Sequence, residues 1–326
     1  MSASYDVLPP PWQLPPGYQR HGSSPAEQWA AIVDLAAHAQ DDLRHWPTLV
    51  EQLVALGRTD VPLARLVEGH LDALRIHDEA GTAPEPGAVY GVWASRSQAT
   101  GISGRRDGAA WVLDGTLRFA SGAGVLDRAL VPVWLADGDH ELLDLDVRAW
   151  KFDESQWATR AMEQSRSHQV ELVDRRAEAV EVGAPGFYLG RPGFFPGGVG
   201  VAAVWAGCAA RVADLLESAV PVEHRSPGKA IRLGQVRSDL ATAAAVCRDA
   251  ARRLPKLDPR DARTTATLAR TGVASCVRRI LADARTIAGA AGLAYDEDLT
   301  RAVDDLTLYV AQHNADGDAE WLGGLS

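Results

Sequence analysis

The spacing of apolar residues changes twice along the chain, and this change constrains the fold most strongly. Residues 25–80 and 191–326 carry apolar residues at helical spacing, whereas residues 81–190 alternate in the manner of β-strands. A proline-rich arm, residues 1–24, comes before them. We therefore expect an α+β chain that is mainly helical: a short set of N-terminal helices, a middle antiparallel β-domain and a C-terminal four-helix bundle.

The clearest N-terminal helix is expected at DVPLARLVEGHLDALRI, residues 60–76. Asp60 is placed to cap this helix, and Pro62 stands in the first turn, where a missing N–H costs nothing. His70 lies on the apolar face of the helix, where a hydrogen-bonded core histidine is favoured over a catalytic one. In the middle region, the Asp114-Gly115 pair within AAWVLDGTLRFASG predicts a hairpin turn, because Gly tolerates positive φ.

Composition excludes several classes of function. The net charge of −10 and the lack of a basic stripe argue against nucleic-acid binding. We expect no membrane span and no signal peptide, because no apolar run approaches ~20 residues and the N-terminus lacks a charged-then-apolar build. Cys208, Cys247 and Cys276 have neither metal-ligand nor disulfide spacing, so we expect buried thiols, no metal site and a cytoplasmic location.

Four segments, in order, carry a resemblance to a known family. They are residues 62–76, residues 111–123 (WVLDGTLRFASGA), residues 225–240 (Arg-x-x-Gly, then LGQVRSDL) and residues 288–314, which end in LTRAVDDLTLYVAQHN. Together they resemble the acyl-CoA dehydrogenase family, a flavoprotein superfamily that also includes flavin-dependent monooxygenases. The order of helices, β-domain and four-helix bundle is the order of that family.

The resemblance implies an FAD cofactor and places five residues around it. Phe119 would lie against the isoalloxazine, and Ser121 would hydrogen-bond near flavin N5 or O4 through its hydroxyl or its backbone N–H. Arg225 matches the arginine that contacts the FAD pyrophosphate across a subunit interface, and guanidinium groups bind phosphate bidentately. Gly289 and Gly292 match a glycine-rich turn near the partner subunit's cofactor. A homodimer or homotetramer is therefore expected.

The chain departs from the family pattern on the substrate side. The N-terminal helical region is shorter than usual, and residues 90–100 (YGVWASRSQAT) lack the acids and the proline of the usual loop. His313 stands where most relatives carry the catalytic Glu, and a histidine can act as a base near neutral pH. Glu223, two residues before Arg225, is the other candidate base. A plain helix-terminal role for His313 is the structural alternative.

These features lead to three hypotheses about function. The first is an FAD-dependent acyl-CoA dehydrogenase-like oxidoreductase that acts on acyl-CoA or a similar thioester, with an electron-transfer flavoprotein or oxygen as the acceptor. The second is a flavin-dependent monooxygenase of the same fold, supplied with reduced flavin. The third is a non-catalytic subunit that completes a partner's site in a mixed oligomer.

Overall fold

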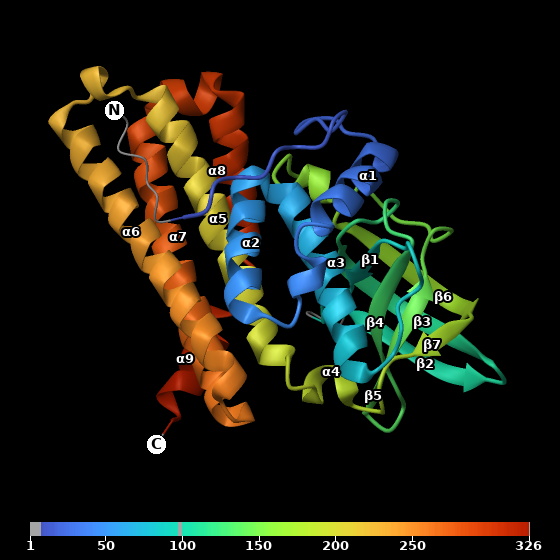
Figure 1. The fold of residues 1–326 in the computed structure, drawn as a ribbon. Helices are drawn as coiled ribbons and strands as arrows, with labels where there is room; N and C mark the ends of the chain where they lie inside the picture. Colours follow the sequence, from blue (N-terminus) through green and yellow to red (C-terminus); the bar gives the residue numbers. More distant parts are fainter. Residues whose placement is uncertain (1–7, 97–99, 326) are drawn as a thin grey trace.

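The computed structural model describes residues 8–96 and 100–325. Its N-terminal helices lie between a β-sheet and a helical bundle (Figure 1). These helices are α1 (Pro25–Ala36), α2 (Trp46–Thr59) and α3 (Val61–Ala80). The described part of the proline-rich arm packs on α2 and α3 of its own chain, because the Trp12 backbone N–H donates to Thr59 Oγ1 and the Tyr18 hydroxyl donates to Asp60 Oδ1.

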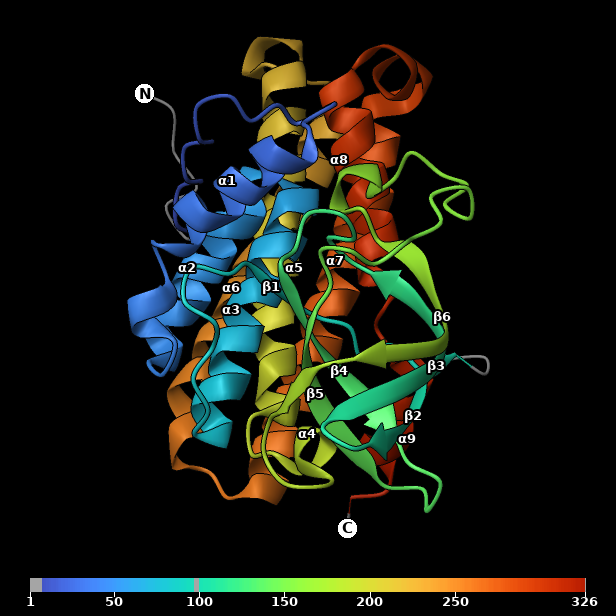
Figure 2. The ribbon, with the colours of Figure 1, turned by 90° about the vertical axis from the view of Figure 1, so that its right-hand side faces the viewer.

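The middle region forms one sheet in the strand order β6-β3-β2-β4-β5-β7, with β1 paired to β4. Figure 2 shows the sheet in front of the helices. The pairing is mostly antiparallel, as expected, but β1 and β2 each pair with β4 in parallel. The strands are β1 (Tyr90–Val92), β2 (Gly101–Asp107), β3 (Ala110–Ala120), β4 (Arg128–Trp134), β5 (His140–Asp146), β6 (His168–Ala177) and β7 (Ala179–Glu181).

The hairpin expected at Asp114-Gly115 is wrong. β3 runs through both residues, and the turn between β2 and β3 is at Gly108, which has a φ of +65°. Gly115, with a φ of +131°, forms an irregularity in the pairing of β3 with β6. A Cβ atom at Gly115 would lie 2.2 Å from the Gly101 carbonyl oxygen, so the glycine permits close strand packing inside the sheet.

The C-terminal region is helical, and its four longest helices form the expected bundle. Three of them begin with a side-chain cap: Ser226 accepts from the Lys229 N–H, Asp258 from the Asp261 N–H and Asp296 from the Leu299 N–H. The helices are α4 (Phe187–Gly190), α5 (Phe194–Ala219), α6 (Pro227–Arg253), α7 (Pro259–Tyr295), α8 (Glu297–Val310) and α9 (Ala315–Gly323). Cys208, Cys247 and Cys276 are buried free thiols on three of these helices.

Helix α5 is the centre of the helical core. Contrary to the expectation from the sequence, it is long and apolar enough to cross a membrane by length and composition, but 78 % of its apolar window is buried within the protein. It crosses α2 at two glycines: a Cβ atom at Gly57 would lie 2.2 Å from the Val204 carbonyl oxygen, and one at Gly207 would lie 2.1 Å from the Val54 carbonyl oxygen. The two helix backbones are therefore in direct contact, which only glycine allows.

Candidate functional site

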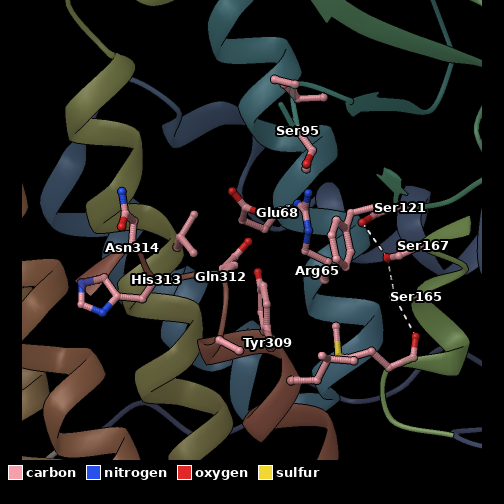
Figure 3. Close-up of a pocket in the computed structure, with 18 of the residues that line it drawn as sticks. Arg65, Glu68, Ser95, Ser121, Ser165, Ser167, Tyr309, Gln312, His313 and Asn314 are labelled. Atoms are coloured by element: carbon pink, nitrogen blue, oxygen red, sulfur yellow. Dashed lines mark hydrogen bonds and ion pairs between the residues drawn. The ribbon is translucent and has the colours of Figure 1, made fainter. Parts of the chain in front are cut away.

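A cavity of about 950 Å³ lies where α3, the end of β3 and α8 meet. Its helical side is formed by α3, α8 and residues 311–316, and its sheet side by the end of β3 and the loop between β5 and β6 (Figure 3). The volume is near the upper end of the range, roughly 300–1,000 Å³, that is usual for ligand pockets. It therefore has room for a cofactor ring together with a small substrate.

Phe119 is an aromatic residue on the sheet side of the cavity. Its side chain is 53 % exposed, and the edge of its ring meets Trp157 at a centroid distance of 6.2 Å. Its φ is +59°, a conformation that costs energy for a bulky residue and that collects at functional sites. The backbone therefore holds an open aromatic face against the cavity.

The loop between β5 and β6 completes the sheet side. Met162, which lines the cavity, and Arg166 also have positive φ values of 56° and 46°. The carboxylate of Asp305 in α8 accepts a hydrogen bond from the Met162 backbone N–H, which holds the loop against the bundle. Burial raises the pKa of Asp305 to about 7, although this hydrogen bond acts in the opposite direction.

Three serine hydroxyls line the cavity in a row (Figure 3). Ser121 Oγ lies 2.8 Å from Ser167 Oγ, and Ser167 Oγ lies 2.7 Å from Ser165 Oγ. Ser165 in turn donates to the Met162 carbonyl oxygen at 2.7 Å. The row fixes the side chain of Ser121 next to Phe119.

The helical side of the cavity is polar. Glu68 and Arg65, three residues apart on α3, form an ion pair at 2.8 Å, and burial raises the pKa of Glu68 to about 7 although Arg65 lowers it. Tyr309 of α8 is only 4 % exposed, and its hydroxyl has no hydrogen-bond partner among the residues that the structure describes. Figure 3 shows the Glu68 carboxylate and the Tyr309 hydroxyl facing the same open space.

His313 follows α8 and lines one end of the cavity, but its ring is turned away from Glu68 and Tyr309 (Figure 3). Arg278 can only donate, so it gives a hydrogen bond to His313 Nδ1 at 3.2 Å. His313 Nε2 therefore carries the proton and donates to Asp318 at 3.0 Å. Burial lowers the pKa of His313, assisted by Arg270, so the ring is neutral and both of its nitrogens are engaged.

The other predicted site residues lie at one end of the bundle. Glu223 is exposed in the short turn between α5 and α6, and Arg225 donates to the Val220 carbonyl oxygen in the same turn. Gly289 has a φ of +60° and kinks α7 shortly before α8, and Gly292 follows within α7. Figure 1 shows both turns at the same end of the bundle. None of the four is among the described residues that line the cavity of their own chain.

Two further expectations concern α3 and the segment after β1. His70 is a core histidine, since it is buried and its Nδ1 accepts a hydrogen bond from the Tyr90 backbone N–H at 3.1 Å. Ala94 and Ser95 of the altered loop line the cavity, whereas residues 97–99 of that loop lie outside the described residues.

The sequence matches no protein-family model and no curated protein significantly. Solved structures match over nearly the whole chain. TdsC from Paenibacillus sp. A11-2, solved with FMN and indole and named a dibenzothiophene monooxygenase, is 17 % identical with a TM-score of 0.74, and the match covers 93 % of this chain and 90 % of TdsC. KijD3, solved with FMN and a dTDP-linked amino sugar, is 17 % identical with a TM-score of 0.75 over 91 % and 85 %. XiaF from Streptomyces sp., solved with FADH2 and glycerol, is 18 % identical with a TM-score of 0.74 over 94 % and 88 %.

This chain has the acyl-CoA dehydrogenase fold. The fold class expected from the sequence is thereby confirmed, including the four-helix bundle and the short N-terminal helices. The structure brings three of the seven predicted site residues, Phe119, Ser121 and His313, to one cavity.

The sequence reasoning missed the polar half of this cavity. Arg65, Glu68 and Asp72 are spaced three and four residues apart on α3, which is otherwise mostly buried. A row of charged residues on a buried helix indicates a cavity that these residues line, because charged side chains are rarely buried without a partner. Ser165 and Ser167 gave no such signal, since their meeting with Ser121 depends on the fold of a long loop.

Proposed function

We propose that this chain is a flavin-dependent monooxygenase that oxidises a small polar molecule. The observation that carries the proposal is the cavity at α3, β3 and α8, which has an exposed aromatic face on one side and a buried carboxylate on the other. The fold, shared with structures that contain FMN or FADH2, supports a flavin as the cofactor.

The sheet side of the cavity fits a flavin ring. Such a ring needs an apolar platform and a few polar groups that set its reactivity. Phe119 and Trp157 offer the platform, and the hydroxyl of Ser121 offers the polar contact. When bound, the flavin supplies the electrons with which oxygen is activated; the protein holds the ring and excludes water from it.

The helical side of the cavity fits the substrate. A buried hydroxyl without a partner costs roughly 1–3 kcal/mol, so the Tyr309 hydroxyl is matched by a polar group of the bound molecule. The Glu68 carboxylate faces the same space and is placed to accept a hydrogen bond from an O–H or N–H group of the bound molecule. Both groups favour a substrate with an O–H or N–H group over one that is purely alkyl.

The state of His313 favours oxygenation over α,β-dehydrogenation. Dehydrogenation needs a base that removes a weakly acidic proton next to the flavin. Both ring nitrogens of His313 are engaged with Asp318 and Arg278, and Glu223 lies at the end of the bundle. Neither predicted base faces the substrate space in the chain described here.

Dehydrogenation of an acyl thioester is the second candidate function, and one observation supports it. Glu68 is a buried carboxylate in the cavity, and its raised pKa of about 7 suits a general base at neutral pH. In this reading Glu68 takes the proton, and an electron-transfer flavoprotein or oxygen accepts the electrons.

Arg225, Gly289 and Gly292 do not line the cavity of their own chain, so contact with a flavin requires a partner subunit. We propose a homodimer or homotetramer in which these residues contact the FAD or FMN of a partner subunit. Apolar side chains at the same end of the bundle support an interface there: Val222, Ile231 and Tyr295 are 72 %, 65 % and 90 % exposed. Cross-linking or sedimentation of the purified chain tests this assembly.

The central experiment is reconstitution with flavin. The protein is mixed anaerobically with reduced FMN or FAD, exposed to ¹⁸O₂ and offered a panel of small amines, phenols and indoles. Incorporation of ¹⁸O into one of these compounds supports the monooxygenase. Anaerobic bleaching of bound oxidised flavin by an acyl-CoA supports the dehydrogenase instead. A protein that binds neither flavin refutes both enzymes and leaves the non-catalytic subunit of a mixed oligomer.

A further inference from the structure

The row of serine hydroxyls has a fixed direction. Each hydroxyl carries one hydrogen, and a carbonyl oxygen can only accept. Ser165 donates its hydrogen to the Met162 carbonyl oxygen, so the hydrogen bond between Ser165 and Ser167 is donated by Ser167. Ser167 has no second hydrogen to donate, so the hydrogen bond between Ser167 and Ser121 is donated by Ser121.

The backbone N–H of Ser121 is also engaged. It donates to the Phe119 carbonyl oxygen at 2.9 Å, and the Ser121 carbonyl accepts from Trp93 Nε1 at 2.9 Å. All three serines are buried, with exposed fractions of 8 %, 0 % and 8 % for Ser121, Ser165 and Ser167, so the direction of the row is not easily reversed by solvent. Both donors of Ser121 are directed into the protein, and the remaining lone pair of Ser121 Oγ is an acceptor.

We propose that the serine row makes Ser121 Oγ a dedicated hydrogen-bond acceptor in the cavity, which selects the reduced flavin over the oxidised one. This inference rests on the proposed flavin-dependent function. N5 of an oxidised isoalloxazine has no hydrogen and can only accept, so it cannot pair with an acceptor. Two electrons from an external reductant and a proton from solvent, taken up before binding, give the ring an N5–H donor that can. The N3–H group is present in both states and does not discriminate.

The consequence is measurable as a linked pair of quantities. If the reduced ring binds more tightly than the oxidised ring, the potential of the bound flavin rises, by about 30 mV for each tenfold ratio of dissociation constants in a two-electron couple. One hydrogen bond that the reduced ring forms and the oxidised ring cannot form corresponds to a preference of roughly tenfold for the reduced ring. Ser167 and Ser165 act as positioning residues in this scheme, because they orient the hydroxyl of Ser121.

The test compares the wild-type chain with Ser167→Ala, using FMN and dithionite-reduced FMN as probes in anaerobic titrations. Ser167→Ala removes the acceptor of the Ser121 hydrogen, so this hydroxyl can turn and donate to oxidised N5. We expect the preference of the variant for reduced FMN to fall by roughly tenfold and the potential of its bound flavin to fall by about 30 mV. Ser165→Ala, which breaks the row one step further away, should shift both quantities in the same direction.

Ser155→Ala is the matched control, because Ser155 is exposed in the same loop and bonds to Asp153 outside the cavity. It should leave both affinities unchanged. Circular dichroism and thermal unfolding check that each variant is folded. Equal affinities of the wild-type chain for FMN and reduced FMN overturn the inference while the proposed function stands. Failure to bind either FMN or FAD, oxidised or reduced, refutes the proposed function itself.

Discussion

Asp305 offers a sharp test of how the loop between β5 and β6 is held against the bundle. Its carboxylate is buried at the contact between α8 and Met162, and it accepts a hydrogen bond from the Met162 backbone N–H. The change Asp305→Asn keeps an oxygen in this position and removes the ionisable group. It therefore separates the hydrogen bond, which is retained, from the burial of a charge, which is abolished.

The expected magnitude follows from the pKa. Burial raises the pKa of Asp305 from 3.8 to about 7, which corresponds to about 4 kcal/mol at most. Between these two values the folded protein holds a proton that the unfolded chain has released, so the free energy of unfolding falls as the pH rises from about 4 to about 7. The Asp305→Asn variant does not show this fall in the free energy of unfolding, because it has no carboxyl group at this position. The difference in stability between variant and wild type should therefore grow in favour of the variant by up to about 4 kcal/mol across this range.

Urea denaturation followed by circular dichroism, repeated at several pH values, measures this difference. Contributions from other titrating groups cancel when the two proteins are compared at each pH. Asp34→Asn is the control, since Asp34 is exposed on α1 and is not among the groups that shift the pKa of Asp305, and it should follow the wild-type profile. Parallel profiles of wild type and Asp305→Asn would refute the reasoning, because they would mean that Asp305 is charged in the folded protein at ordinary cost.

Three further predictions use stability or activity as the measurement. Gly207→Ala should lower the free energy of unfolding by about 2 kcal/mol or more, because the added Cβ meets the backbone of α2, whereas Gly228→Ala, whose Cβ meets no atom of the described residues within 4 Å, should not; chemical denaturation decides. Tyr309→Phe should raise stability by about 1 kcal/mol and lower turnover of the identified substrate, and a clear loss of stability would show that the hydroxyl is already paired in the free protein. Burial lowers the pKa of His70 to about 4, so the folded ring is neutral while the unfolded one gains a proton; stability should fall between about pH 6.5 and pH 4, and His70→Gln should reduce this acid loss in denaturation series.

Helix positions could be predicted well because their signals are local. The Asp60 cap and Pro62 start α3 where the sequence indicates, and Gly81, with a φ of +68°, ends it. Gly115 shows the limit of local signals. An Asp-Gly pair serves equally well in a hairpin turn and in a strand irregularity, and the choice depends on the neighbouring strand at Gly101, which is not a local property.

The site could be predicted in part for the same reason. Phe119 stands near the end of β3 and Ser121 directly follows that strand, so a single motif indicates both. The position of His313 was predicted, but the direction of its ring depends on Arg278 and Asp318, which come from two other helices. Glu68 and Tyr309 face the same open space although more than two hundred residues separate them in the sequence, and such an arrangement follows only from the assembled fold.

The glycine crossing of α2 and α5 has a mechanical consequence for ligand exchange. Two backbones in contact at Gly57 and Gly207 form a joint with no side chains that can shift, and α3 follows α2 after the single residue Asp60. The α3 wall of the cavity is therefore held rigidly against the bundle. Access for a bulky ligand must come from the opposite wall, where the loop around Met162 is held by the Asp305 carboxylate and by hydrogen bonds from Gln28 to Gln164, and attempts to enlarge the cavity should begin there.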